Sequence, residues 1–260
     1  HFTGRLKEFN INLKTLNLDL KYFGFRWWHL FFVKKKYNDQ YTEKFDLIID
    51  LQSKLRNTII LKQLPHTHFY SSTYGFRFCS NNKKYFIDDH IINLCDFLNV
   101  NLKIKKFNLN NLDKKYIAEA KRLLPDKNYI GFSITQGNLY RKKSWSLENF
   151  ISLANKISDK NKIPVFFIEK DKKDLVEEIK SKVSNALFPE YYSNLSCPAL
   201  VTALATRLDL AISIDNGVMH MISLANIPMI VLFGPTDSKK FSPQIDKIKI
   251  IDSKKIYNSE

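Results

Sequence analysis

The sequence lacks most of the features that would place it in a familiar class. Its three cysteines, Cys79, Cys95 and Cys197, are far apart and include no CxxC pair, which argues against a zinc site or a disulfide framework. With 7 glycines and 8 prolines in 260 residues, it shows no low-complexity tract. No apolar run approaches the roughly 20 residues of a membrane-spanning helix, and the first residues do not resemble a signal peptide. We therefore expect a cytoplasmic protein.

Acidic residues are scarce relative to basic ones. The 41 lysines and arginines against 26 acidic residues give a formal net charge of +15. Such a field attracts anionic partners, including nucleic acid, acidic lipid and phosphorylated substrates. Lysine, asparagine and isoleucine are abundant throughout the chain, so composition alone can also explain the charge. No RNP, KH or helix-turn-helix signature accompanies the charge, and we do not expect nucleic acid to be the partner.

Hydrophobic residues make up 44% of the chain, enough for a buried core. Short apolar runs alternate with segments of helical period. The predicted strands are 45–51, 129–134, 163–169, 208–214, 228–234 and 248–252. The predicted helices are 88–100, 146–158, 172–183, 197–208 and 217–226, with one more inside 105–128. This alternation predicts an α/β fold in which helices cover both faces of a parallel sheet.

The pattern also predicts how the chain divides into domains. Strands and helices alternate most clearly over 128–252, and a smaller α/β unit comes before them. We expect a Rossmann-like N-terminal domain at 1–105, a polar and basic connection at 106–127, and a Rossmann-like C-terminal domain at 128–260.

Polar loops directly follow three of the predicted strands in the C-terminal domain. They read TQGNLYRKKSW from Thr135, DNGVMH from Asp215 and PTDSKKFSP from Pro235. The carboxyl ends of parallel strands meet at one edge of an open sheet, and ligands bind there. The three loops therefore predict one ligand site.

The residues in these loops suit a diphosphate. Gly137 and Gly217 leave the backbone bare for close approach by a ligand. Asn216 and Gly217 open a predicted helix, whose free N–H groups and positive dipole end favour a phosphate. Lys142 and Lys143 can neutralise the phosphate charge. Each feature alone has an ordinary explanation as a turn or a solvated charge, and it is their joint occurrence after successive strands that indicates the site.

The same loops resemble a known family. The hallmark of the ADP-heptose:lipopolysaccharide heptosyltransferases, glycosyltransferase family 9, is similar to DNGVMHMISLANIPMIVLFGPTD, and Phe241 and Pro243 match the aromatic residue and the proline that follow it. A second family signature resembles GFSITQGNLYRKKSWSLENFISLANKI, and a motif of the first domain resembles FDLIIDLQSKLRNT. The resemblance is specific over 129–243 and clear at 45–58. It implies a GT-B fold, in which two Rossmann-like domains with parallel sheets face a cleft.

The resemblance and the loop chemistry together give a set of donor-binding residues. Asn216 replaces the hydroxyl residue that is usual in the family. Lys143 matches a lysine that pairs with donor phosphate, and His220 matches a histidine near the donor. Glu169 and Lys170 stand where the family has a glycine pair, so Glu169 is expected to take the ribose hydroxyls instead. The expected donor-binding residues are Thr135, Gln136, Gly137, Lys142, Lys143, Glu169, Asp215, Asn216, Gly217 and His220.

The activity that the resemblance implies is transfer of a heptose-type sugar with inversion. The donor would be a nucleotide sugar, ADP-heptose in the family, and the acceptor a lipopolysaccharide core or another lipid-linked sugar. Neither a metal ion nor another cofactor is expected. The Gly-Asp loop that carries the family's proposed general base has no counterpart here, so the chain reads as incomplete at both termini. We assign no catalytic base, although Asp50 ends a predicted strand.

Two other classes of function stay open. A non-catalytic nucleotide-sugar-binding protein fits if the catalytic aspartate is missing from the whole reading frame. A basic nucleic-acid-binding protein fits the net charge. A Gly-Asp loop upstream would favour the enzyme, and retention on nucleic acid at low salt would favour the last class.

The segment 21–37 is dense in aromatic residues and basic at both ends, and it reads KYFGFRWWHLFFVKKKY. It fits a core helix of the first domain with a solvated basic end. It also fits a face that docks on an anionic membrane, because Trp and Tyr favour the headgroup region and Lys and Arg are attracted to it. A lipid-linked acceptor would make docking on the inner face of the inner membrane useful. Arg56, Lys62 and Arg77 are then expected to contact acceptor phosphates or acidic sugars.

Overall fold

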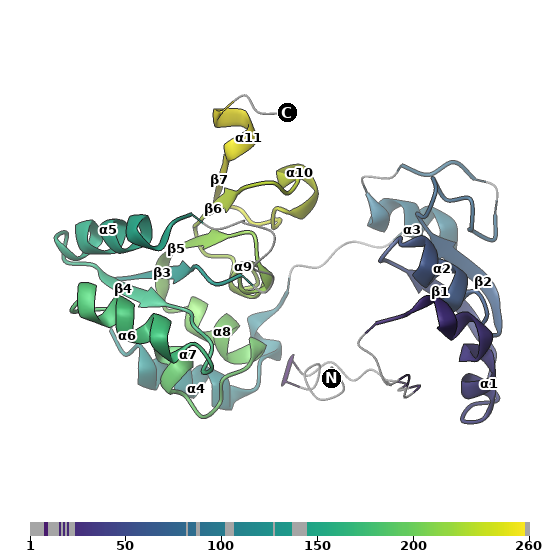
Figure 1. Cartoon of the computed structure of the whole chain (residues 1–260), viewed down its shortest axis with the longest axis horizontal. Helices are drawn as coiled ribbons and strands as arrows, with labels where there is room; N and C mark the ends of the chain where they lie inside the picture. The colour runs from purple at the N-terminus through teal and green to yellow at the C-terminus, as the bar shows by residue number, and fades with distance from the viewer. Residues whose placement is uncertain are drawn as a thin grey trace. The chain divides into compact units, whose positions relative to one another are not determined.

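The chain forms two compact units in the computed structural model (Figure 1). Lys14–Lys105 form the smaller unit, and His1–Leu13 with Lys106–Glu260 form the larger unit. The structure describes residues 8–9, 16, 18, 20, 24–81, 83–86, 89–101, 107–126, 128–136 and 145–257.

The smaller unit is built on two parallel strands. Its elements are η2 (Trp27–Phe31), α1 (Val33–Asn38), β1 (Phe45–Asp50), α2 (Leu55–Leu61), β2 (His66–Ser71) and α3 (His90–Leu98). In the ladder, Ile48 lies opposite Phe69. Its core contains Val33, Tyr37, Ile60 and Phe69, so α1 and α2 pack on the strands through their buried faces.

The larger unit carries a five-stranded parallel sheet of order β4-β3-β5-β6-β7. Its elements are η3 (Leu109–Asn111), α4 (Lys114–Leu123), β3 (Tyr129–Ser133), α5 (Leu147–Ser158), β4 (Ile163–Phe166), α6 (Lys173–Lys182), α7 (Pro189–Tyr192), α8 (Pro198–Ala205), β5 (Leu208–Ile214), α9 (Gly217–Ser223), β6 (Met229–Phe233), α10 (Ser238–Phe241), β7 (Ile248–Asp252) and α11 (Ser253–Ile256). All six predicted strands are present, and the predicted α/β class is confirmed.

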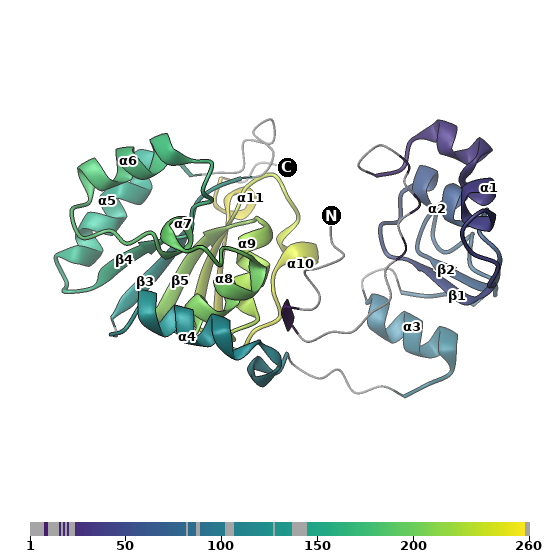
Figure 2. The same ribbon diagram turned by 90° about the horizontal axis from the view of Figure 1, so that it is seen from below.

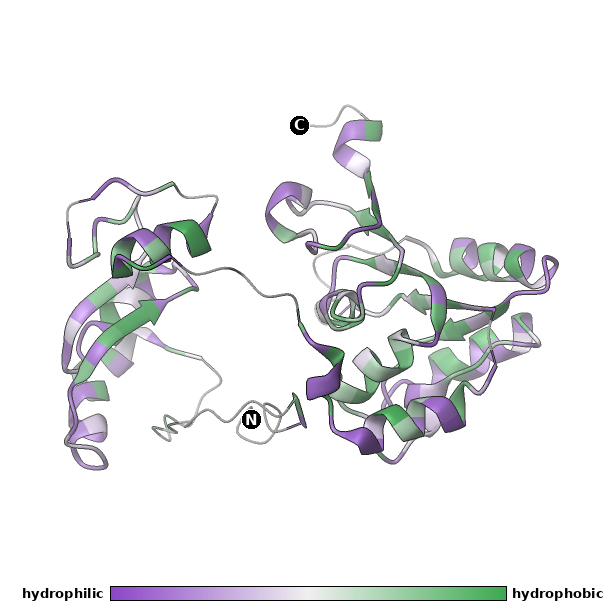
Figure 3. Cartoon of the chain, turned by 180° about the vertical axis from the view of Figure 1, so that it is seen from behind, coloured by the Kyte–Doolittle hydropathy of each residue, from purple (hydrophilic) through white to green (hydrophobic). Residues whose placement is uncertain are grey.

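Helices cover both faces of this sheet. Helices α5 and α6 lie on one face, and α4, α8 and α9 lie on the other (Figure 2). Successive strand residues point to opposite faces, so Phe132 and Phe166 pack towards α5 while Tyr129 and Val165 pack towards α8. Both faces of β3 and β4 are buried, which explains why these strands are apolar runs, whereas Lys249 and Ile250 of the edge strand β7 are exposed (Figure 3).

Side-chain caps start several helices of the larger unit, among them α4, α5 and α9. Asp113 caps α4 by accepting from the Lys115 N–H at 3.0 Å, and Ser146 caps α5 through the Asn149 N–H at 3.4 Å. Asn216 caps α9 in the same way. Each cap satisfies a backbone donor that has no partner inside its helix. The cap of α9 places its first residue, Gly217, directly after β5.

Candidate functional site

The loop after β3 and the start of α9 are joined by the side chain of Asn216. Its Nδ2 donates to the Thr135 carbonyl oxygen and to Ser133 Oγ, both at 2.8 Å. Its Oδ1 accepts from the Met219 N–H at 2.8 Å. The predicted meeting of these loops at the carboxyl edge of the sheet is therefore present. The amide of Asn216 is used for these internal bonds, so it positions the loops.

Asp215 joins the end of β5 to the loop after β6. The Thr236 hydroxyl donates to Asp215 Oδ2 at 2.6 Å, and the Asp215 side chain is buried. The third predicted loop thus reaches the same place as the other two. Thr236 belongs to the GPT sequence that follows β6, and this contact is a physical reason for a hydroxyl residue there.

Gly217 leaves open space at the first turn of α9. Its backbone is not in the left-handed region, and a Cβ atom built on it would meet no other heavy atom within 4 Å. Neither the backbone nor the packing of the chain therefore requires glycine here. A bare backbone beside the carboxyl edge of the sheet suits close approach by a ligand.

Two carboxylates, Glu169 after β4 and Glu190 in α7, lie close enough to interact electrostatically. The Thr135 hydroxyl donates to Glu169 Oε1 at 3.3 Å, which links the exposed Glu169 to the β3 loop. Glu190, in α7, is buried, and its Oε1 accepts from Ser196 Oγ at 3.3 Å. Burial, and after it the charge of Glu169, raises the pKa of Glu190 to about 7. Sequence reasoning missed Glu190, although its position between Pro189 and two tyrosines was a signal of apolar surroundings.

His220 lies on the exposed side of α9, one turn after Asn216. Desolvation by the surrounding chain lowers the pKa of His220, and the charge of Asp215 opposes this shift. The imidazole is therefore neutral at pH 7 and can accept a hydrogen bond as well as donate one. His220 also lines a cavity of about 390 Å³ together with Ser223 and Pro243.

Three of the predicted donor-binding residues, Gly137, Lys142 and Lys143, lie outside the described residues. Gln136 is half-buried and follows Thr135 in the β3 loop. Among the residues that the structure describes, no group of three His, Cys, Asp or Glu side chains could hold a metal ion.

The structure does not bring the predicted acceptor residues into one cluster. Lys62 Nζ donates to the Phe78 carbonyl at 3.3 Å and lies 5.4 Å from the centre of the Phe69 ring, so this lysine takes part in packing. Arg56 is half-buried in α2, and Arg77 is exposed in the loop after β2. Among the described residues, no hydrogen bond or ion pair joins the three.

Asp50 is held in place by several donors. Its Oδ1 accepts from the Gln52 N–H at 3.0 Å, and its Oδ2 accepts from Thr58 Oγ1 at 2.5 Å and from Ser71 Oγ at 3.0 Å. The carboxylate is 2% exposed. It therefore ties β1, α2 and β2 together, and this structural role explains the aspartate without assigning it as a base.

The parallel sheet with helices on both faces defines the class as a Rossmann-like α/β protein. The sequence model of glycosyltransferase family 9 (heptosyltransferase) matches residues 39–260. The match covers most of the chain, so the chain belongs to glycosyltransferase family 9, as its resemblance implied. No curated protein matches the chain.

Solved structures of glycosyltransferases share the fold. A glycosyl transferase family 9 protein from Veillonella parvula is 18% identical, with 87% of this chain and 67% of that chain covered and a TM-score of 0.63. E. coli heptosyltransferase WaaC with ADP is 13% identical, with 81% of this chain and 67% of that chain covered and a TM-score of 0.59. E. coli ADP-heptose lps heptosyltransferase II is 15% identical, with 84% of this chain and 71% of that chain covered and a TM-score of 0.57. These likenesses confirm the predicted GT-B fold.

Proposed function

We propose that this glycosyltransferase moves a heptose-type sugar from a nucleotide-sugar donor, ADP-heptose, to a lipopolysaccharide-core-like acceptor with inversion. The observation that carries the proposal is the joining of three loops at the carboxyl edge of the sheet by Asn216 and Asp215. Family membership supports it, and a structure of WaaC with ADP-2-deoxy-2-fluoro heptose, at a TM-score of 0.59, has the same fold. In this proposal the larger unit, 128–260 in particular, binds the donor, and the smaller unit, Lys14–Lys105, binds the acceptor.

The chemistry of this proposal is a displacement at the anomeric carbon. An acceptor hydroxyl attacks the sugar, the bond from the anomeric carbon to the diphosphate breaks, and ADP leaves with the electron pair. Lys142 and Lys143 stabilise the charge on the departing diphosphate. A general base takes the acceptor proton, and we assign that base to none of the residues described here.

The donor site is tested with two variants and calorimetric titration of ADP. Lys143→Ala removes a charge-assisted phosphate contact, and Asp215→Ala removes the acceptor that holds the Thr236 loop in place. We expect each to weaken ADP binding by roughly 1.5–3 kcal/mol. The matched control is Asp209→Ala, because Asp209 lies at the opposite end of the same strand in an exposed ion pair with Lys162 at 2.9 Å. Unchanged ADP affinity in both site variants would reject the site.

We also propose that the smaller unit docks on an anionic membrane through η2 and α1. Trp27, Trp28 and Phe31 are 49%, 48% and 88% exposed, while Val33 and Tyr37 are buried in the core. The buried residues fit the core interpretation of 21–37, and in this proposal the exposed aromatic residues are the ones that meet the membrane. The lysines of α1 add attraction to acidic headgroups, on the order of 1 kcal/mol each. Among the described residues, no helix is long and apolar enough to cross a membrane.

Docking is tested by co-sedimentation with liposomes that contain phosphatidylglycerol. We expect binding at low salt that falls as salt screens the charges. Phe31→Ser and the double variant Lys34→Gln/Lys35→Gln should each reduce it severalfold. Phe86→Ser is the matched control, since Phe86 is 79% exposed in the same unit but outside these elements. Absent binding at low salt, or equal loss in the control, argues against this face.

A further inference from the structure

The smaller unit contains a cavity that none of the predicted residues explains. Its volume is about 450 Å³, within the roughly 300–1,000 Å³ of typical ligand pockets. It lies at the carboxyl end of β1 and beside α2. The described residues that line it are Leu16, Leu18, Leu20, Gly24, Phe25, Ile49, Asp50, Leu51, Gln52, Asn57 and Leu61.

The buried side-chain amide of Asn57 lines this cavity, and one of its polar atoms makes no hydrogen bond among the described residues. Asn57 is 6% exposed. Its Nδ2 donates to Gln52 Oε1, but its Oδ1 has no hydrogen-bond partner among the described residues. A buried polar atom without a partner costs free energy. A ligand that supplies a donor at this point would remove that cost.

The charge of the lining excludes anions. Asp50 is the one charged residue among the described residues that line the cavity, and its carboxylate accepts three hydrogen bonds of the roughly four that a carboxylate can take. A phosphate would be repelled by Asp50, whereas a hydroxyl can donate to it. A hydroxyl can both donate and accept, so it pairs with Asp50, Gln52 and Asn57 alike.

The remaining lining is apolar. Leu18, Phe25 and Leu61 are partly buried residues packed against the core of this unit, and they also form part of the cavity wall. A ligand for this cavity therefore needs C–H surface on one side and hydroxyls on another. Sugars combine these two properties.

We propose that this cavity binds an uncharged, hydroxyl-rich saccharide through Asp50, Gln52 and Asn57. This inference rests on the proposed function in identifying that saccharide with a neutral part of the acceptor. It moves acceptor recognition away from Arg56, Lys62 and Arg77, which do not line the cavity among the described residues. Any phosphate on the acceptor then lies outside the cavity.

The test is saturation-transfer NMR of the full chain with methyl α-mannoside and, as the matched anion, mannose 6-phosphate. We expect the neutral glycoside to bind at least about tenfold more tightly than the phosphate. Asn57→Ala should weaken glycoside binding about tenfold, as expected for the loss of a hydrogen bond in a closed site. Asn93→Ala is the control, because Asn93 is equally buried in the same unit but does not line the cavity.

Gln52→Ala covers the case in which Asn57→Ala does not fold. Gln52 is exposed, and its loss takes the acceptor from Asn57 Nδ2 but removes no core side chain. Gln52→Ala should still weaken glycoside binding at least threefold. The inference would be overturned if mannose 6-phosphate bound more tightly than the glycoside, or if both variants bound the glycoside as tightly as the parent does. ADP titration of the same samples separates the two proposals: ADP binding without glycoside binding rejects this cavity alone, and glycoside binding without ADP binding rejects the donor site alone.

Discussion

At Asn216 a single side chain replaces the hydroxyl residue of the family and does more than cap a helix. A hydroxyl at this position could accept from the Met219 N–H, as serine and threonine caps do. The amide also donates from Nδ2, and this reaches Ser133 and Thr135 on the neighbouring strand and loop. Since an amide has both donors and an acceptor, the departure from the family pattern has a structural reason.

The buried carboxyl of Glu190 makes stability depend on pH. Its pKa is raised from 4.5 to about 7, mainly by burial. The folded state therefore binds a proton more tightly than the unfolded state between these values. The contribution of this group to the free energy of unfolding is fully present below about pH 4.5 and is lost as pH rises through about 7. We expect Glu190→Gln to be more stable than the parent at pH 8, by roughly 3 kcal/mol at most, and equal to it near pH 4.5.

Urea unfolding at a series of pH values, followed by circular dichroism, measures this difference. Glu178→Gln serves as the control because Glu178 is exposed in α6. Comparing each variant with the parent at the same pH removes the contributions of titrating groups that do not interact with Glu190. A constant difference between Glu190→Gln and the parent over the whole range would contradict the assignment.

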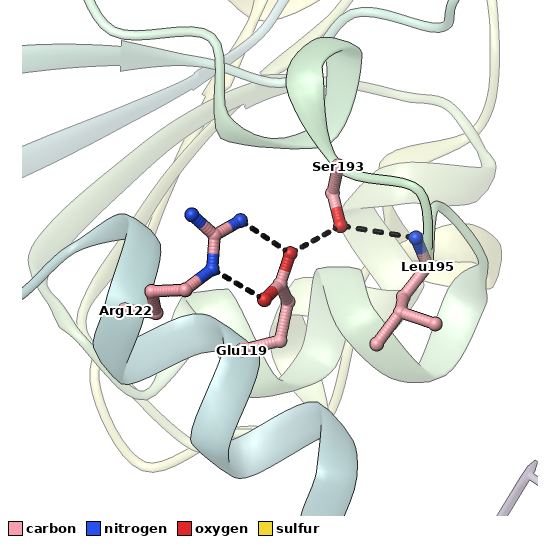
Figure 4. Close-up of polar contacts among 4 residues, drawn as sticks. All are labelled: Glu119, Arg122, Ser193 and Leu195. Carbon is pink, nitrogen blue, oxygen red and sulfur yellow. Dashed lines mark hydrogen bonds and ion pairs between the residues drawn. The ribbon is translucent and has the colours of Figure 1, made fainter.

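Among the elements, α4 is attached to the loop after α7 by a polar network (Figure 4). Arg122 Nε and Nη2 donate to the two oxygens of Glu119 at 2.7 and 2.8 Å, and Ser193 Oγ donates to Glu119 Oε1 at 2.7 Å. Ser193 in turn accepts from the Leu195 N–H at 3.1 Å. Glu119 is thus the member that joins the helix to the loop. The bond from Arg122 is the main reason that the pKa of Glu119 is lowered to about 2.

We predict that Glu119→Ala costs more stability than Arg122→Ala. Removing Glu119 leaves the fully buried Ser193 hydroxyl without its acceptor, at about 1–2 kcal/mol. The Arg122 side chain is 65% exposed, so its loss should cost less than about 1 kcal/mol. Urea unfolding at pH 7 measures both, with Glu178→Ala in the exposed Glu178–Lys182 pair as the control. The opposite order would show that the ion pair, and not the link to the loop, stabilises this region.

The elements also show what the sequence could predict. Strands β3 and β4 were predictable because both of their faces are buried and their runs are apolar. Strand β2 was missed because its first half, His66 to His68, is polar and partly exposed. The bonds of Asn216 join residues 81 and 83 positions apart in the chain, and no local pattern reports such a contact. The cavity beside Asn57 was missed for the same reason, since Leu18 and Phe25 line it together with residues much further along the chain, such as Asp50.

On the scale of the whole molecule, the two units have separate hydrophobic cores. The core of the smaller unit contains Phe69, and the sheet of the larger unit has one cluster on each face. The expected donor-binding residues all belong to the larger unit. Units with their own cores can unfold separately, in which case unfolding is not two-state. Ligand binding then stabilises the unit that holds the site.

We therefore predict two unfolding transitions in differential scanning calorimetry. ADP should raise the melting temperature of one of them. At 100 times its dissociation constant, ADP should stabilise the larger unit by about 2.7 kcal/mol and leave the smaller unit unchanged. Two core variants identify the transitions, because Phe69 and Phe166 are both fully buried, one in each unit. Phe69→Ala should lower the melting temperature of the transition that ADP does not move. Phe166→Ala should lower the melting temperature of the transition that ADP raises. Each substitution should reduce the free energy of unfolding of its unit by about 3–5 kcal/mol. A single transition that both variants lower would mean that the units unfold together, and an ADP shift of the transition assigned by Phe69→Ala would place nucleotide binding in the smaller unit.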